Sequence, residues 1–244
     1  MAEITHGIDT KKQQTSVASP TVVACGIPFV VGASPAHMVG GKVNSVIMAN
    51  DYEEAVKALG YSDDWEKYGL SEAVYTQFVL YQQFPAFFVN VLDPEKHKKE
   101  ESKEFEIAEN QITLPLEAIA DSVKIEGKEK GTDFEAFYND TNCIVEFMED
   151  TTGTMTVSYT AVDPSKVTKA DIIGGYSIAT HKTTGLELID DCFPKYRTVP
   201  DLILCPNWSH DSEVAAVMSA KGENINGLFL ADAILDVDTR EGSG

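Results

Sequence analysis

Apolar runs divided by polar segments predict a chain that begins with strands and helices in turn. Residues 21–32 form an almost continuous apolar run that ends in glycine, which is typical of a buried strand. Residues 43–48 predict a second, short strand, and residues 86–92 predict a third, buried one. Residues 1–19 are polar with only spaced apolar side chains, so they are either disordered or completed by a partner.

Helix signals stand between these strands. Asp51 and Glu54 have the spacing of a capping box, and Gly60 is placed to end the helix that follows. Ser71 is expected to cap a second helix, which Pro85 ends. The first 94 residues therefore predict the order β-α-α-β.

The segment 60–68 joins the two predicted helices and is rich in aromatic and acidic residues. We expect Tyr61, Trp65 and Tyr68 to pack into the core, while the aspartates between them stay solvated or accept backbone hydrogen bonds. The segment is therefore interpreted as a structural link without chemistry of its own.

The pattern changes at residue 95. Residues 95–106 are densely charged and are interpreted as a solvated linker or a domain boundary. Short strand-like segments follow, separated by turn residues, at residues 123–126, 134–138, 143–148 and 154–162. This spacing predicts a small antiparallel β-sandwich or partial barrel over about residues 102–162.

After Pro164 the pattern predicts helices and strands in alternation. Thr168 is expected to cap a short helix. A helix at residues 186–196, a buried strand at 201–205, a helix at 211–225 and a strand at 228–237 complete the prediction. A β-α-β order of this kind requires parallel strand pairing with a right-handed crossover.

The charge of the chain narrows the possible partners. The 244 residues carry a formal net charge of −20, which repels phosphate and argues against binding of nucleic acid or an anionic membrane surface. The apolar stretches are too short and too interrupted to span a bilayer, so no membrane insertion is expected. Four cysteines beside apolar runs are interpreted as buried free thiols: Cys25, Cys143, Cys192 and Cys205.

Two segments contain the residue types of known functional motifs. Gly40-Gly41-Lys42 follows a predicted strand, but Ala36 and Val43 stand where a phosphate loop needs a glycine and a hydroxyl. Ser209-His210-Asp211 places three triad residue types side by side. Adjacent side chains point apart, so Ser209 or Asp211 is interpreted as a helix N-cap.

Metal and cofactor sites are not indicated. Four of the histidines have no Cys, Asp or His at the spacing that a metal site requires. These are His6, His37, His97 and His181. Asp190 and Asp191 face apart on their predicted helix, whereas Asp236 and Asp238 would share one strand face and be able to hold a cation. We therefore expect no cofactor and no enzymatic activity.

Several specific pieces occur in a fixed order along the chain. These are His6-Gly7-Ile8, Pro20-Thr21-Val22-Val23-Ala24 running into residues 28–37, residues 59–65, residues 87–94, and Asn224-Ile225-Asn226-Gly227 leading to residues 236–239. In this order they resemble the tail sheath protein of contractile phage tails and related contractile particles. The match is best over residues 1–94 and from about Pro200 onward. The β-rich middle of the chain matches the family in the position and type of this region more than in specific motifs.

The resemblance implies a mixed α+β chain of four parts. These are an N-terminal arm at residues 1–19, part of an inner core domain at 20–94, a β-sandwich-like outer domain at 95–164, and the start of a subtilisin-like α/β domain at 165–244. It also implies that arms add strands to the sheets of neighbouring subunits, with Ile4, Ile8 and Val17 setting the register.

The resemblance further implies a structural subunit of a contractile sheath, which assembles helically around the tail tube and contracts to drive it through a cell envelope. Its partners would be neighbouring sheath subunits, the tail tube protein and the baseplate, in a virion tail or a prophage- or bacteriocin-type particle assembled in the host cytoplasm. The family continues past Thr239, so the chain is expected to be truncated at its C-terminus. The alternatives are a non-contractile β-sandwich adaptor of a virion and an acidic α/β hydrolase.

Overall fold

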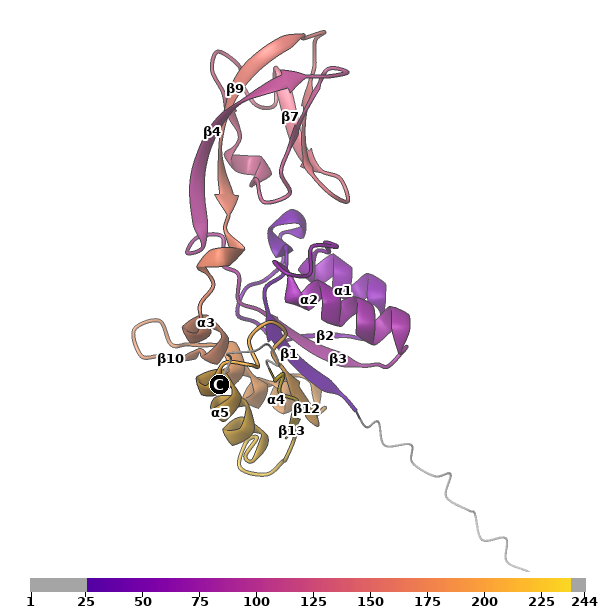
Figure 1. The fold of residues 1–244 in the computed structure, drawn as a ribbon, viewed down its shortest axis with the longest axis vertical. Helices are drawn as coiled ribbons and strands as arrows, with labels where there is room; N and C mark the ends of the chain where they lie inside the picture. The colour runs from indigo at the N-terminus through magenta and orange to yellow at the C-terminus, as the bar shows by residue number, and fades with distance from the viewer. Residues whose placement is uncertain (1–25, 238–244) are drawn as a thin grey trace, which may run out of the picture.

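The computed structural model describes residues 26–237, which form an α/β unit and a β unit that stands on it (Figure 1). The α/β unit consists of residues 26–97 and 163–237, and the β unit consists of residues 98–162. Helices combined with several small sheets confirm the expected α+β fold class. Residues 1–25 and 238–244 lie outside the described part of the chain.

A five-stranded sheet forms the centre of the α/β unit, in the order β13-β12-β1-β3-β2. Its strands are β1 (Pro28–Gly32), β2 (Ile47–Ala49), β3 (Ala86–Asn90), β12 (Leu202–Leu204) and β13 (Asp232–Ala233). Neighbouring strands are parallel except β2, which is antiparallel to β3. Every residue of β1 and β3 is buried, which confirms the strands predicted there from continuous apolar sequence.

The sheet joins two segments that the sequence assigned to different domains. β1, from the expected inner core, pairs with β12, from the expected α/β domain, with Phe29 opposite Ile203. Main-chain hydrogen bonds therefore connect the two segments directly. We propose that the expected inner core part at residues 20–94 and the expected α/β part at residues 165–244 share this sheet, with the β unit inserted between them.

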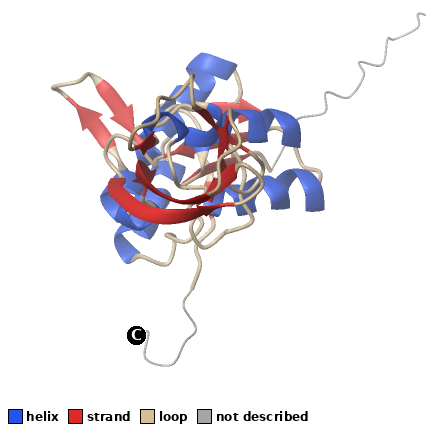
Figure 2. Cartoon of the chain, turned by 90° about the horizontal axis from the view of Figure 1, so that it is seen from above, coloured by secondary structure: helices blue, strands red, loops and turns tan. Residues whose placement is uncertain are grey.

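Helices cover both faces of the five-stranded sheet (Figure 2). Phe88 of β3 packs on one helix layer and Phe87 on the other, because successive side chains of a strand point to opposite faces. The first layer contains α1 (Tyr52–Leu59), α2 (Gly69–Val74) and the π-helix Tyr75–Leu80. The second contains α3 (Lys169–Ile173), the 3-10 helix Gly185–Asp191, α4 (Cys192–Tyr196) and α5 (Ser212–Gly222).

The predicted ends of α1 are confirmed. The Asp51 carboxylate accepts a hydrogen bond of 2.8 Å from the backbone N–H of Glu54, and Gly60 follows the helix with a φ of 69°. The Glu54 carboxylate accepts from the backbone N–H of Asn50, one position earlier than a capping box requires. Short-range signals therefore set both ends of this helix.

The cap predicted at Ser71 is wrong, because α2 begins at Gly69. The Ser71 side chain is buried, and its hydroxyl accepts a hydrogen bond from the backbone N–H of Ser62. A Cβ at position 69 would lie 3.0 Å from the Cβ of Pro206, so this end of the helix is shaped by a distant loop. The hydroxyl thus serves a tertiary contact in place of the helix end.

The link at residues 60–68 packs less completely than expected. Tyr68 is buried as predicted, but Trp65 is 36% exposed and lies against Tyr75 with ring centroids 5.6 Å apart. The side-chain amide of Asn207 donates a hydrogen bond to the backbone carbonyl of Trp65. The expectation of core packing is confirmed for Tyr68 and wrong for Trp65.

The β unit consists of two three-stranded antiparallel sheets that enclose a second core. One sheet, in the order β4-β9-β6, contains β4 (Lys98–Ile107), β9 (Gly153–Val162) and β6 (Lys124–Ile125). The other, in the order β5-β8-β7, contains β5 (Gln111–Leu114), β8 (Cys143–Phe147) and β7 (Phe134–Tyr138). Ile112, Val145 and Val157 are fully buried between them, which confirms the inserted β-sandwich.

The charged run at residues 95–106 is largely a strand, so its interpretation as a linker is wrong. β4 pairs with β9 along its whole length, from Lys98 opposite Val162 to Ile107 opposite Gly153. Lysines on either side of Glu101 form ion pairs with it. Pairing with a distant strand rich in threonine and valine overrides the low strand propensity of lysine and glutamate.

The last part of the chain differs from the prediction mainly at element ends. The parallel pairing of β12 and β13, with α5 between them, confirms the β-α-β order. The predicted helix at residues 186–196 is a 3-10 helix followed by α4, and only β13 forms from the strand predicted at 228–237. The unpredicted hairpin of β10 (Gly175–Ser177) and β11 (Lys182–Thr184) projects from the α/β unit (Figure 1).

Short 3-10 helices complete the described structure, at Ala36–Val39, Ala120–Ser122 and Pro164–Lys166. Among the described residues, no helix has the length and apolar character needed to cross a membrane.

Candidate functional site

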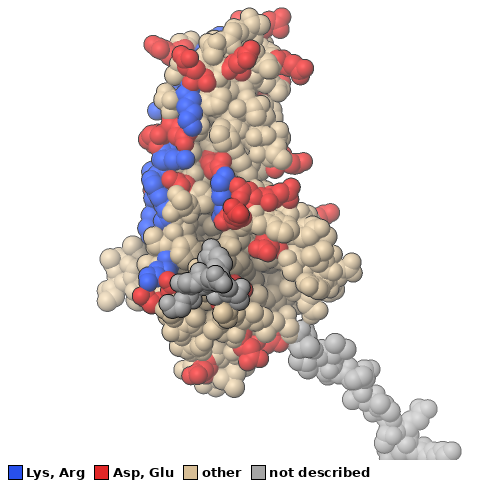
Figure 3. Space-filling view, in the orientation of Figure 1, with Lys and Arg blue, Asp and Glu red and all other residues tan. Residues whose placement is uncertain are grey.

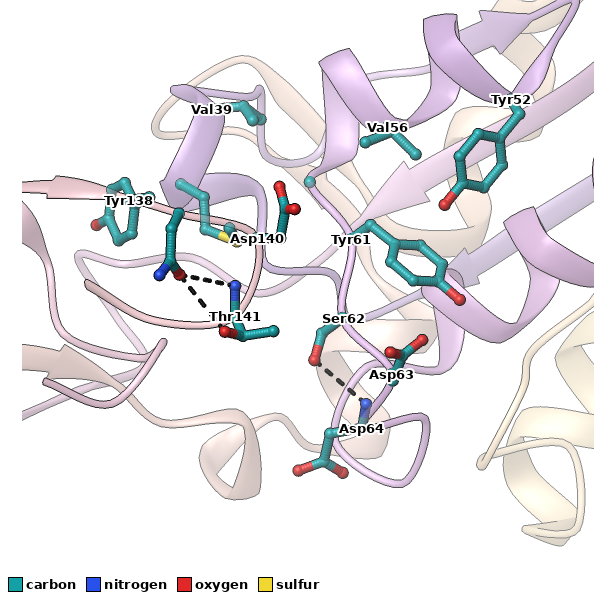
Figure 4. Close-up of a pocket in the computed structure, with 13 residues that line it drawn as sticks. Val39, Tyr52, Val56, Tyr61, Ser62, Asp63, Asp64, Tyr138, Asp140 and Thr141 are labelled. Atoms are coloured by element: carbon teal, nitrogen blue, oxygen red, sulfur yellow. Dashed lines mark hydrogen bonds between the residues drawn. The ribbon is translucent and has the colours of Figure 1, made fainter. Parts of the chain in front are cut away.

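A cleft of about 760 Å³ lies where the two units meet (Figure 4). One wall comes from the 3-10 helix Ala36–Val39, from α1 and from the loop that follows α1; the other comes from the end of β7 and the turn after it. The side chains that line it are Met38, Val39, Tyr52, Val56, Tyr61, Ser62, Asp63, Asp64, Tyr138, Asn139, Asp140 and Thr141. Apolar and aromatic walls are thus combined with three aspartates.

Local contacts hold both walls of the cleft in place. The rings of Tyr52 and Tyr61 meet edge to face with centroids 5.8 Å apart, across the length of α1. On the opposite wall, the side-chain oxygen of Asn139 accepts a hydrogen bond of 2.9 Å from the backbone N–H of Thr141, which closes the turn after β7 (Figure 4). The walls are therefore shaped before any ligand arrives.

The titratable groups of the cleft are acidic and phenolic. Burial raises the pKa of Tyr52 and of Tyr61, and the nearby Asp63 carboxylate raises both further. Asp64 pairs with Lys67 at 2.8 Å, and this hydrogen bond lowers the pKa of Asp64. Because the phenols stay protonated at neutral pH, they donate hydrogen bonds but do not act as bases. The cleft suits binding contacts more than covalent chemistry.

His37 connects the two units beside the cleft. Its Nε2 lies 2.9 Å from the backbone carbonyl oxygen of Leu116, so Nε2 carries the proton and donates. Its ring meets that of Tyr138 edge-on at 5.8 Å. Burial lowers the pKa of His37, although the Leu116 hydrogen bond and the charge of Glu117 oppose this effect. Nδ1 is buried without a partner in the described residues, so the neutral ring fits the junction.

We expect acidification to weaken the protein partly through His37. The pKa of His37 is lower in the folded chain than in the unfolded chain, where it lies near 6.5, so the unfolded chain takes up the proton first. The stability contributed by the neutral ring is present above pH about 6.5 and is lost as pH falls through the folded-state pKa. A single proton limits this slope to about 1.4 kcal/mol per pH unit.

Urea unfolding of the protein and of a His37→Gln variant between pH about 5 and 7 measures this contribution. Glutamine keeps a donor for the Leu116 carbonyl but does not titrate. The stability difference between the two proteins should therefore shrink as pH falls, because only the histidine form is penalised. A difference that stays constant across the range would show that the pKa of His37 is the same in the folded and the unfolded chain, which contradicts the prediction.

Gly40-Gly41-Lys42 has a packing role that does not suit a phosphate loop. Gly40 follows the 3-10 helix Ala36–Val39 in the left-handed conformation, with a φ of 62°. A Cβ on Gly41 would lie 2.2 Å from the backbone carbonyl oxygen of Ala58, near the C-terminal end of α1. That end of a helix carries partial negative charge, which disfavours phosphate. The interpretation of this segment as a turn is confirmed.

Ser209, His210 and Asp211 do not form a catalytic relay. The Asp211 carboxylate accepts hydrogen bonds from two backbone N–H groups in the first turn of α5, so Asp211 is the predicted N-cap. Ser209 is buried, and its hydroxyl donates to the carboxylate of Asp236. His210 is exposed. The three side chains thus serve different contacts.

The cysteines and carboxylates show no sign of a reactive or metal-binding centre in residues 26–237. Cys143, Cys192 and Cys205 are buried free thiols, as predicted, and burial raises the pKa of each, that of Cys143 to about 11. No group of three His, Cys, Asp or Glu side chains within that range can hold a metal ion. Cys25 and Asp238 lie outside the described residues.

The arm residues predicted to contact neighbouring subunits also lie outside the described range. These are Ile4, Ile8 and Val17. Their proposed role therefore stays a prediction.

Two groups of exposed apolar side chains, which no sequence pattern predicted, lie at different places on the α/β unit. The π-helix patch, at the end of the α1–α2 layer, consists of Val79, Leu80, Tyr81 and Phe84, which are 40–73% exposed. The β13 patch, at the other edge of the sheet from β2, consists of Leu228, Leu230, Ile234, Leu235 and Val237, which are 41–80% exposed. Groups of exposed apolar side chains of this kind are candidate contact sites.

A signal for these patches is present in the charge pattern. Residues 73–92 and residues 224–231 contain no charged side chain, in a chain of which 24% is charged. Apolar sequence also marks buried strands, so this signal alone does not separate exposed from buried positions. The exposure of the two patches emerges only from the fold.

Comparison with known proteins gives a distant similarity that covers nearly the whole chain. No family model matches the chain. It is 24% identical over 247 residues to the tail sheath protein of Burkholderia phage BcepMu. The alignment covers 95% of this chain and 49% of that protein, so the chain spans about half the length of this curated relative. The similarity suggests a sheath-like structural role.

Proposed function

We propose that the chain is part of a structural subunit of a contractile phage-tail-type sheath. The observation that carries the proposal is the similarity to a phage tail sheath protein over 95% of the chain, through the α/β unit and the β unit alike. The subunits assemble helically around a tail tube, and the sheath contracts to drive the tube through a cell envelope. The work is mechanical, and the chain is not an enzyme.

The environment of the candidate catalytic residues supports this proposal. Asp211 caps α5, Ser209 is bonded to Asp236, and Gly41 packs against the end of α1. The phenols of the cleft and the buried thiol of Cys143 have raised pKa values, so they stay protonated at neutral pH and do not act as bases or nucleophiles. Each of these groups serves folding or packing, as expected of an assembly subunit.

The proposed partners are neighbouring sheath subunits, the tail tube protein and the baseplate, in a virion tail or a related particle assembled in the host cytoplasm. The edge strand β2 is the place where an arm from a neighbour would add a strand. In such an arm Ile4, Ile8 and Val17 would set the register. The β12-α5-β13 segment would be the start of the subtilisin-like domain.

Electron microscopy of the full-length gene product, expressed with its tube protein, tests the proposed function. We expect tubes or cogwheel-like arrays with a regular helical repeat, because heterologous contacts that do not close produce helical assemblies. A His210→Ala variant, which changes an exposed residue outside both patches, should assemble equally well. Discrete particles at every protein concentration would contradict the proposal and favour the alternative, a non-contractile adaptor.

A further inference from the structure

We propose that the π-helix patch of one copy of the chain binds the β13 patch of the next copy. The inference rests on the proposed function and identifies the surfaces through which its subunits meet. The occupant of each patch is therefore a second copy of this chain. The contact is heterologous, because the two copies contribute different surfaces.

The π-helix patch is held in a defined shape. Phe78 faces the core and packs against Phe88 with ring centroids 6.1 Å apart, which turns the opposite side of the helix outward. The Gln77 side-chain amide donates to the backbone carbonyl of Gln83, and the Gln83 backbone N–H donates to the Gln77 carbonyl. This closes the loop that presents Leu80. A preformed apolar surface loses little entropy on binding.

Contacts with the rest of the α/β unit also hold the β13 patch in place. Phe229 packs against Phe193 with ring centroids 5.2 Å apart, whereas its neighbours Leu228 and Leu230 are 79% and 74% exposed. Both backbone and side chain of Asn226 are hydrogen-bonded to Asp190. The exposed leucines therefore stand on a loop that is tied to the rest of the unit.

Repulsion between the negative charges of two identical copies limits which of their surfaces can come into contact. Each copy has a net charge of −20, so most mutual orientations bring like charges together. Acidic side chains are scattered over the visible face, and lysine and arginine gather mainly along one side of the β unit (Figure 3). Residues 73–92, which contain the π-helix patch, carry no charge, so the exposed Asp232 and Asp236 among the residues of the β13 patch meet no like charge in this contact, whereas two β13 patches would bring these aspartates together.

The area of the patches supports pairing them with each other. An apolar side chain of this size presents on the order of 100 Å² to water, so four and five such side chains offer roughly 400 and 500 Å². Together they bury roughly 900 Å², close to the minimum of about 1,000 Å² for a specific interface. Pairing a patch with a copy of itself would leave the other patch exposed, whereas the heterologous contact covers both and repeats along an array.

Substitutions that introduce a negative charge in one patch and a positive charge in the other test the proposal. Leu80→Glu in the π-helix patch and Leu230→Lys in the β13 patch should each weaken self-association of the full chain by about tenfold or more in sedimentation velocity. A chain that carries both changes places opposite charges in every contact and should recover most of the association. If Leu230→Lys has no effect, or if the double variant does not recover, the proposal is overturned.

Cross-linking tests the same contact without relying on loss of binding. In a Cys25→Ser background, a Leu80→Cys chain is mixed with a Leu230→Cys chain and oxidised. We expect a disulfide between the two different chains. An Ile178→Cys chain is the control, because that side chain is 81% exposed but lies outside both patches, and it should not cross-link. Disulfides confined to chains of one kind would overturn the proposal.

The reactivity of the same thiols in dilute solution separates a second copy from other occupants. Both the Leu80→Cys and the Leu230→Cys thiol should react with a maleimide as fast as the Ile178→Cys control, and become protected as the chain associates. Slow reaction in the dilute monomer would show that another segment of the same chain covers the patch, which overturns the proposal.

Failure of this inference is distinguishable from failure of the proposed function. Normal tubes formed by the Leu80→Glu variant would leave the sheath function standing and refute the contact. Association through the two patches into discrete particles without tubes would support the contact and refute the sheath function.

Discussion

Replacing Phe87 by alanine should lower the free energy of unfolding by about 3–5 kcal/mol. Phe87 is fully buried in the middle of the five-stranded sheet, opposite Phe29 of β1, and its ring lies 5.7 Å from that of Tyr196 in α4. Its removal leaves a cavity between the sheet and the second helix layer, where the two halves of the α/β unit meet. The surrounding strands cannot collapse into that space without losing their register.

Urea unfolding followed by circular dichroism measures this loss. The matched control is Phe137→Ala, the same change at a side chain that is 43% exposed and lies outside both patches, and its expected effect is within about 0.5 kcal/mol. Equal losses in the two variants would show that the shared sheet is not the main source of stability.

Replacing Asn90 by leucine should cost about 2–5 kcal/mol, because it leaves two buried N–H groups without acceptors. The side-chain oxygen of Asn90 accepts hydrogen bonds from the backbone N–H groups of Ser34 and Leu92, both at 3.0 Å. The side chain is fully buried, so water cannot replace these bonds. Leucine has a similar volume, which separates the loss of hydrogen bonds from a change in packing.

The effect of this substitution should extend beyond stability. Asn90 ties the chain after β1 to the segment that leaves β3 toward the β unit, so hydrogen exchange at Ser34 and Leu92 should accelerate in the variant. The same change at the exposed Asn224 should alter stability by no more than about 0.5 kcal/mol. Unchanged protection at both amides would contradict this role for Asn90.

Short-range signals in the sequence were reliable where the relevant partners lie within one turn. Asp51, Thr168 and Asp211 stand at the helix starts where they were predicted, and Gly60 follows the end of α1. A side-chain oxygen and the backbone N–H two or three residues later meet whenever the helix forms, so no tertiary information is needed.

Predictions failed where a residue's partner is far away in the chain. Ser71 has the chemistry of a cap but bonds the backbone of Ser62. The charged run before Ile107 became β4 because β9 pairs with it. Neither partner is visible in a local pattern, since strand propensity depends on the neighbouring strand and on burial.

Of the candidate site, the sequence predicted only that the apparent catalytic motifs are not functional. Adjacent triad residue types and an incomplete phosphate loop argued against catalysis, and the structure gives Asp211 and Gly41 other contacts. The cleft at the junction of the two units arises from segments far apart in the sequence. The same is true of the exposure of Leu80 and Leu230, because apolar residues in a charge-free stretch also suit a buried strand.

The sequence by itself determined the buried strands at the centre of the α/β unit, the starts of α1, α3 and α5, the β-sandwich between residues 102 and 162 and the incompleteness of the local catalytic motifs. Only the tertiary structure decided that β1 pairs with β12, that a charged segment is a strand, and that two apolar patches face solvent. The physical reason is the distance along the chain over which each interaction acts. Caps and periodic patterns act over a few residues of backbone, whereas strand pairing and exposure depend on which distant segments arrive beside each other.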